Sequence, residues 1–207
     1  FLATKGGDRV TLTGTSFGPA DTPVNVHYGP ELQGDARLRR YTAVECIHDV
    51  NEPHSKVECV SVAGVGAAHT WMVEVDSQIS PASSDTTSYK TPLVTDVRGV
   101  GAMDAHTQGG QSLIIVGESF GPLTSGDASS SPDLVVTYGG AAGLTYTATS
   151  CRVTSISPQA QISCLTSPGI GKGHALLLGV GSQTSGLYDA GIGYSRPVVS
   201  GYTVKGA

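Results

Sequence analysis

The chain of 207 residues lacks the features that several classes of protein need. No run of about 18 apolar residues is present, so we expect no membrane-spanning helix. Charged residues make up only 14% of the chain, and the formal net charge of −5 offers no basic surface for nucleic acid. The one short basic run, residues 37–40, is expected to be solvated surface. We therefore expect neither a membrane span nor a nucleic-acid partner.

Signals for catalysis and metal binding are also weak. Serine, histidine and aspartate are present, but no motif is expected to bring them together around a nucleophile. Asp104, His106 and Asp133 are scattered oxygen and nitrogen ligands without the spacing of a calcium loop or a zinc site. We therefore predict that the protein is not an enzyme and holds no cofactor or metal.

What the sequence does contain is a tandem repeat. Residues 6–18 return as residues 109–121, with an offset of 109 − 6 = 103. Tyr28 returns as Tyr138, with an offset of 138 − 28 = 110. The four cysteines and the segments Tyr89–Pro92 and Tyr194–Pro197 share an offset of 105, as in 151 − 46. Changes in length are thus confined to two loops, and the framework is kept.

The cysteines form two equivalent pairs, and both pairs have a spacing of 13 residues (59 − 46 and 164 − 151). Each pair flanks a turn-rich segment, so we predict the disulfides Cys46–Cys59 and Cys151–Cys164 across two hairpins. A bridge over so short a loop adds about 2–3 kcal/mol and indicates an oxidising compartment. The alternative, a zinc site, is disfavoured because no Cys-x-x-Cys pair occurs and His48 has no counterpart histidine.

Apolar residues alternate with polar ones along both copies, which predicts half-buried strands separated by Gly-, Pro- and Ser-rich loops. The alternating sets are Val10 and Leu12; Val24, Val26 and Tyr28; Trp71, Val73 and Val75; and Leu176, Leu178 and Val180. We predict one domain over residues 1–91 and a second over residues 92–196. No flexible linker lies at Thr91–Pro92, so the two domains should hold a nearly constant angle.

The first copy lacks a strand that the second copy has. A strand-like segment, Pro92–Val97, precedes Gly109, whereas only five residues precede Gly6. A segment at 197–204 aligns with Pro92 onward, but no further copy of the repeat follows it in this sequence. Joining one chain to the next would place Gly6 sixteen residues after Pro197 (ten to Ala207, then six), close to the seventeen from Pro92 to Gly109.

These motifs resemble the IPT/TIG family over nearly the whole chain. The shared elements are Gly-Gly before an alternating strand, Gly-x-Ser-Phe-Gly, Val-x-Tyr-Gly, a cysteine pair and a closing Tyr-x-x-Pro. The resemblance implies an all-β chain of two tandem immunoglobulin-like (IPT/TIG) β-sandwiches, the first without its own first strand. It also implies an extracellular or cell-surface location and a structural role.

We expect an extracellular structural or adhesive protein whose protomers join head to tail into a filament, so that the main partner is the protein itself. The residues after 196 act as an orphan strand that completes a following domain. Period two places Val198, Tyr202 and Val204 on one face and Val199 on the other, with a bend allowed at Gly201. The predicted donor residues are Pro197, Val198, Val199, Tyr202 and Val204, and the predicted acceptor residues are Phe1, Leu2, Val10 and Leu12.

Other functions fit the same sequence. The chain can be one repeat unit of a longer multi-domain surface protein, or an ectodomain that binds proteins or glycans. Aromatic side chains for a sugar-binding face would come from Trp71, Tyr41, Tyr138, Tyr146 and Tyr188, although core packing is the stronger interpretation. His69 and His174 are expected to bond loop carbonyls. The Ser/Thr-rich loops at 80–92 and 124–132 are candidate O-glycan carriers.

Overall fold

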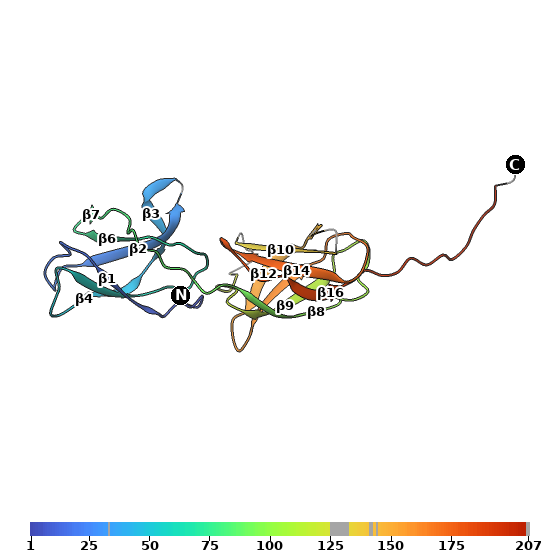
Figure 1. Ribbon diagram of the computed structural model, residues 1–207, viewed down its shortest axis with the longest axis horizontal. Coiled ribbons are helices and arrows are strands. Elements are labelled where there is room, and N and C mark those ends of the chain that lie inside the picture. The colour runs from blue at the N-terminus through green and yellow to red at the C-terminus, as the bar shows by residue number, and fades with distance from the viewer. Residues whose placement is uncertain (33, 125–132, 141–142, 144, 206–207) are drawn as a thin grey trace.

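The computed structural model describes residues 1–205 except 33, 125–132, 141–142 and 144, so most of the 124–132 loop lies outside the described residues. The described part contains sixteen strands and no helix. Strands β1 to β7 form one β-sandwich and β8 to β16 form a second, and the two lie one after the other along the long axis of the molecule (Figure 1). The predicted all-β tandem architecture is confirmed.

The second domain has the strand order of an immunoglobulin fold. One sheet has the order β12-β13-β9-β8, and the other has the order β11-β10-β14 with β15 and β16 both paired to β14. Named in chain order as A to G, these are the A-B-E-D and C′-C-F-G sheets. The bounds are β8 (Leu93–Arg98), β9 (Ser112–Glu118), β10 (Leu134–Gly139), β11 (Tyr146–Thr147), β12 (Thr149–Ser155), β13 (Ala160–Leu165), β14 (His174–Val180), β15 (Gln183–Thr184) and β16 (Tyr188–Ile192).

The first domain repeats this order, but its described residues contain no strand equivalent to β8 or to β16. Its sheets are β1-β5-β4 and β3-β2-β6-β7. The bounds are β1 (Arg9–Thr13), β2 (Val24–Leu32), β3 (Asp35–Thr42), β4 (Val44–His48), β5 (Lys56–Val60), β6 (Trp71–Val75) and β7 (Gln78–Ile79). Strand β1 is equivalent to β9, yet no described strand lies beside it in the place that β8 takes beside β9.

The alternation predicted from the sequence matches the observed burial. Leu176, Leu178 and Val180 on β14 are at most 1% exposed and point into the second core. In the first core, Trp71 is 4% exposed and stacks on Tyr28 with ring centroids 4.1 Å apart. The predicted strands are therefore correct, because one face of each sheet is buried and that burial determines the phase of every strand.

Both predicted disulfides are present. Cys46 on β4 bonds Cys59 on β5, and Cys151 on β12 bonds Cys164 on β13, each with 4.1 Å between the Cα atoms. In each domain the two strands form the predicted hairpin, with the turn-rich segment between them. The bridges thus reinforce the same corner of each sandwich.

Paired tyrosines link the two sheets of each domain. In the first domain the Tyr28 and Tyr89 hydroxyls lie 2.7 Å apart, Tyr89 donates to the Val62 carbonyl at 2.7 Å, and the Val62 N–H donates to Tyr28 at 2.9 Å. Tyr138 and Tyr194 repeat the hydroxyl pair at 2.7 Å in the second domain. Burial raises the pKa of Tyr89 and Tyr194 far above the ordinary value, so both hydroxyls stay neutral hydrogen-bond donors.

Candidate functional site

The unpaired edge of β1 is the main difference between the two domains. In the second domain β8 pairs with β9, with Val94 opposite Gly117 and Val97 opposite Ile115. Strand β1 pairs with β5 on one side, and in the described part of the chain its other side pairs with nothing. An edge of this kind leaves a row of backbone N–H and C=O groups ready to accept another strand.

Side chains on β1 are also less buried than their counterparts on β9. Leu113 and Ile115 are fully buried, whereas the equivalent Val10 and Leu12 are only partly buried. Val116 is 2% exposed and its counterpart Thr13 is classed as exposed. The first domain thus has a threonine, Thr13, where the second domain has the buried Val116. This difference indicates that the end of β1 is incompletely covered in the single chain.

A groove runs along this edge. It has a volume of about 310 Å³, and it is lined by residues 10–13 of β1, by Trp71 and by residues 83–87; we call it the edge groove. A second hollow of about 370 Å³ is lined by residues 15–17, 73, 75, 76 and 78–81, the next positions along both walls. In the second domain β8 lies at this position, with Val94 buried and Val97 packed against the core. The edge groove therefore corresponds to the site of a first strand.

The opposite wall of the groove is less regular in the first domain. Strand β16 pairs with β14, and Tyr188 on it donates to the carbonyl of Thr95 on β8 at 3.0 Å. The equivalent residues 83–87 keep a single bridge, between His69 and Thr87. In the described residues of the first domain, the edge of β1 and the edge formed by residues 83–87 therefore lack a strand equivalent to β8, which contacts both corresponding edges in the second domain.

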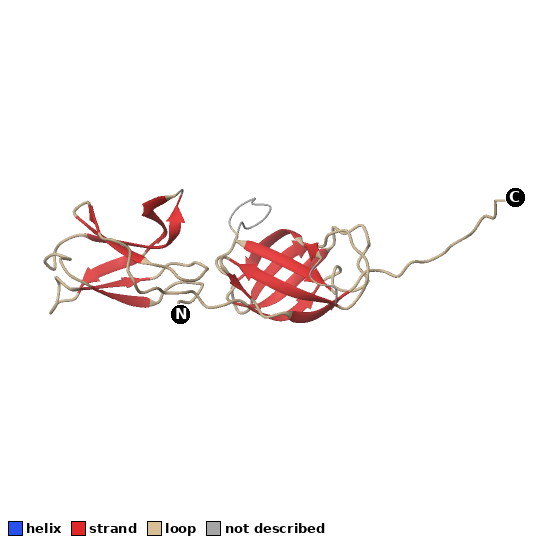
Figure 2. Cartoon of the chain, turned by 45° about the horizontal axis from the view of Figure 1, so that its top comes forward, coloured by secondary structure: helices blue, strands red, loops and turns tan. Residues whose placement is uncertain are grey.

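The C-terminal segment has complementary character. Residues 197–205 form no strand and are all exposed, with Val199 86% and Tyr202 89% exposed. The segment leaves the second domain at the end farthest from the first domain and extends away from it (Figures 1 and 2). Apolar side chains in this number are seldom left in water without a partner.

The predicted acceptor residues have different surroundings. Val10 and Leu12 line the edge groove. Leu2 is 6% exposed and belongs to the core of its own domain, where it forms a parallel bridge with Tyr89. Phe1 is 90% exposed. The equivalent bridge between Ala105 and Tyr194 extends the repeat, at the same offset of 103, back to the start of the chain.

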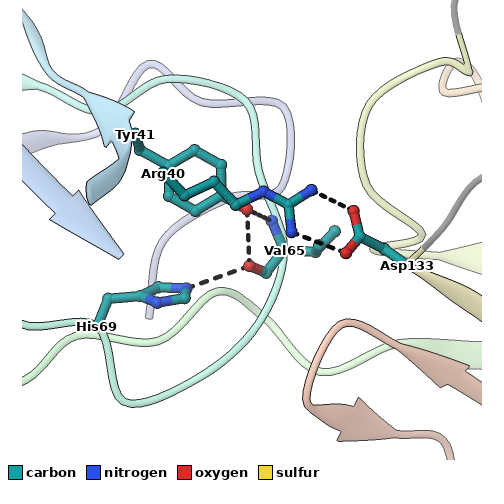
Figure 3. A network of polar contacts seen from close by, with 5 residues as sticks. All are labelled: Arg40, Tyr41, Val65, His69 and Asp133. Carbon is teal, nitrogen blue, oxygen red and sulfur yellow. Dashed lines mark hydrogen bonds and ion pairs between the residues drawn. The ribbon is translucent and has the colours of Figure 1, made fainter. Parts of the chain in front are cut away.

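The duplicated histidines have a structural role. His69 Nε2 lies 3.1 Å from the Val65 carbonyl, and His174 Nε2 lies 2.9 Å from the Ile170 carbonyl (Figure 3 shows the first). Burial lowers the pKa of His69, which favours the neutral ring. The predicted bond from each imidazole to a loop carbonyl is confirmed.

The aromatic side chains considered for a sugar-binding face are mostly buried. Trp71, Tyr41 and Tyr138 are at most 8% exposed. Tyr41 also bonds both the N–H and the carbonyl of Val65 through its hydroxyl. These rings pack in the two cores and do not form an exposed platform, as the packing interpretation predicts.

The prediction that residues 37–40 are solvated surface is wrong for Arg39, and Arg40 is exposed but bonded. Arg39 is 8% exposed and lies 3.3 Å from a carboxylate oxygen of Glu31. Arg40 reaches the second domain and binds both carboxylate oxygens of Asp133, the first at 2.7 Å (Figure 3). This contact could not be inferred from the repeat, because the equivalents of Arg40 and Asp133 are Thr145 and Pro23.

The motif Gly-x-Ser-Phe-Gly at 14–18 and 117–121 also satisfies the Gly-x-Ser-x-Gly pattern of nucleophile elbows. In those enzymes the serine stands between a strand and a helix, whereas here Ser16 and Ser119 lie in loops with φ of 65° and 62° and no helix follows in the described residues. Groups of three or more side chains that could hold a metal are not found in the part of the chain described. The same described residues contain no helix that is long and apolar enough to cross a membrane.

Comparison with known proteins adds little to these observations. No protein-family model and no curated protein matches the chain. Six solved chains match, among them a marsupial T cell receptor with 14% identity and a TM-score of 0.27, covering 88% of this chain and 68% of that one. That likeness carries no argument about function. The strand order itself defines the class, a tandem immunoglobulin-like β-sandwich, and its two disulfides indicate an extracellular domain protein.

Proposed function

We propose that this chain is an IPT/TIG-type structural subunit, which joins head to tail by donating the segment from residue 197 onward to the edge groove of a second copy. One observation carries the proposal. The first domain has an unpaired strand edge beside a groove, and the same chain has an exposed segment whose sequence matches the strand that fills this position in the second domain. Donor-strand complementation uses this combination of backbone pairing and inserted side chains.

The second domain provides the register for the donated strand. The repeat offsets relate each β8–β9 pair to a pair in the proposed junction. Adding 105 to the β8 residue number and subtracting 103 from the β9 residue number converts Val94–Gly117 into Val199–Gly14. The same step converts Val97–Ile115 into Tyr202–Leu12. Tyr202 would then occupy the edge groove beside Trp71, and its hydrophobic ring would be removed from water.

This register changes the expected orientation of the donor side chains. The pairing of β8 shifts between Val94 and Asp96, so both Val94 and Val97 face the core while Leu93 is 52% exposed. The equivalent shift would fall at Ser200–Gly201. Val199 and Tyr202 therefore point inward and Val198 points outward, whereas strict period two paired Val198 with Tyr202.

Donor and acceptor lie at opposite ends of the molecule (Figure 1), so the contact is heterologous. The tail leaves the far end of the second domain, and its own edge groove is in the first. Repeating such a contact without closing a ring produces an open filament. Such a contact would build an extracellular fibre or coat, and we propose an adhesive or structural role for it.

The same junction also fits a covalent arrangement, in which the preceding strand belongs to another domain of a longer chain. A ligand-binding ectodomain is the remaining alternative, with the tail serving as a linker. Candidate glycans or surface proteins would then be the partners.

The test compares the full chain with a version that ends at Arg196, using light scattering and electron microscopy at matched concentrations. We expect filaments from the full chain, monomers from the shortened one, and shorter filaments when free peptide 197–207 is added, because the peptide occupies the groove. If both forms stay monomeric and equally stable, the proposal fails and the ectodomain alternative is favoured.

A further inference from the structure

The contact between the two domains of one chain provides a template for the contact between copies. Val65, on a loop of the first domain, is 5% exposed and packs in the core of the second domain. Its Cγ1 lies only 2.4 Å from where a Cβ on Gly121 would be, so the glycine admits the valine. Two loops meet directly at this point, without a spacer between them.

Polar bonds from Ser182 and Gln183 complete this contact. The Ala67 N–H donates to Ser182 Oγ at 3.0 Å, and the Gln183 amide donates to the Tyr89 carbonyl at 3.0 Å. The consecutive residues Ser182 and Gln183 thus hydrogen-bond the second domain to the first. The same pair occurs at 77–78 in the first domain, at the equivalent position.

The outer end of the second domain presents the loop that carries the equivalent of Val65. Ile170 replaces the valine and is 71% exposed. The loop is held as in the first domain, since the Ile170 N–H donates to Tyr146 and its carbonyl bonds His174. An exposed isoleucine is therefore kept in the geometry in which valine enters the neighbouring domain.

The outer end of the first domain presents the receiving groups. Gly18 is equivalent to Gly121 and has the same φ of +93°, and Thr22 Oγ1 lies 3.0 Å from where its Cβ would be, so an incoming side chain would pack on Gly18 and Thr22 together. Ser77 and Gln78 are exposed, and within the described residues their side chains form no hydrogen bond. Gly18, Ser77 and Gln78 form what we call the docking face.

We infer that the docking face (Gly18, Ser77 and Gln78) binds the outer end of the second domain of another copy. The inference rests on the proposed head-to-tail assembly. Ile170 packs over Gly18, the Lys172 N–H donates to Ser77, and Gln78 donates to the Tyr194 carbonyl. Assembly then joins the same two surfaces that already meet inside each chain, in addition to the donated strand.

At two equivalent positions of the repeat, the residues at the proposed junction between copies differ from those at the junction inside the chain. Asp76 stands where the second domain has Gly181, whose Cβ position is 3.2 Å from Gly66, so the loops must separate by a few tenths of an ångström. Lys172 stands where the first domain has Ala67. A carboxylate and an ammonium group are thus placed on facing loops, and this pair takes the place of Arg40 and Asp133.

The test uses Ile170→Asp and Gln78→Ala in the full chain, with Leu187→Asp as a matched control because Leu187 is 66% exposed and lies outside the docking contact. The critical concentration for filaments is measured by sedimentation. We expect a rise of about tenfold or more for Ile170→Asp and about threefold for Gln78→Ala, with Leu187→Asp unchanged. Binding of peptide 197–207 to each variant ending at Arg196 should be unaffected.

The two readouts separate the two claims. If Ile170→Asp assembles at the same critical concentration as Leu187→Asp while the peptide still binds, the docking face is wrong and strand donation stands. If the peptide fails to bind the unmodified chain ending at Arg196, the proposed function is overturned, and the docking face falls with it.

Discussion

Changing Val199 to aspartate should abolish filament formation at concentrations where the unmodified chain assembles. In the register taken from β8, Val199 lies opposite Gly14 and enters the apolar interior of the neighbouring first domain. Losing a buried valine costs about 1.5–3 kcal/mol, and burying a carboxylate there adds several more. We expect the critical concentration, measured by sedimentation and electron microscopy, to rise by at least about a hundredfold.

The neighbouring residue is the matched control for this prediction. Val198 has the same side chain and the same exposure in the single chain, 87% against 86%. Its counterpart Leu93 is half exposed on β8, so Val198→Asp should change the critical concentration by no more than about threefold. Equal effects of the two substitutions would show that the segment does not enter a groove in this register.

Replacing Cys46 and Cys59 together by alanine should destabilise the first domain by about 2–4 kcal/mol. The bridge closes a short loop in a domain whose β1 edge is uncovered, so little other constraint compensates for its loss. Chemical unfolding can be followed by the emission of Trp71, which is the one tryptophan of the chain and lies in the first core. The Trp71 midpoint should fall clearly, and peptide 197–207 should recover part of the loss.

The equivalent change in the second domain separates local from general effects. Cys151 and Cys164 changed to alanine remove a bridge with the same spacing of 13 residues, but from a domain that has its first strand. The Trp71 midpoint should then move less than half as far. An unchanged Trp71 midpoint after loss of Cys46–Cys59 would contradict the claim that this disulfide supports the incomplete domain.

The sequence was sufficient to predict the sandwich class and the disulfides because both depend on local, repeated patterns. Alternation along Trp71, Val73 and Val75 determines which face is buried, and the turn between paired cysteines determines the hairpin. The paired tyrosines Tyr28 and Tyr89 were visible as repeated landmarks, but their shared bond to Val62 depends on the distance between two sheets.

Two features could not be predicted from the sequence for physical reasons. Arg40 and Asp133 stand at positions that the repeat does not conserve between copies, and only the packing of one domain on the other brings them together. The shift in β8 between Val94 and Asp96 depends on pairing with β9 and leaves no mark in the alternation of apolar residues. Without it, strict period two places Tyr202 on the same face as Val198, whereas the proposed register places it with Val199.

The proposed strand donation would give a reason for the separation of the β1 edge and the C-terminal segment at opposite ends of the molecule. A tail that could reach its own groove would satisfy the edge within one chain and stop assembly. Here the tail extends away from the first domain (Figure 2), and this direction would leave the edge of each copy open to the proposed partner copy. Such an edge is an aggregation hazard unless a specific strand competes for it, and the proposed register of Val199 and Tyr202 would provide that specificity.

The most direct test of the account is to titrate the chain ending at Arg196 with peptide 197–207, and to record Trp71 emission and thermal unfolding. Trp71 lines the edge groove, so strand donation predicts a saturable emission change at one peptide per chain. At a peptide concentration a hundred times Kd the first domain should gain about 2.7 kcal/mol, which raises its Tm by roughly 10–20 °C. A peptide carrying Val199→Asp should do neither. No change in emission or Tm with the unmodified peptide would contradict strand donation.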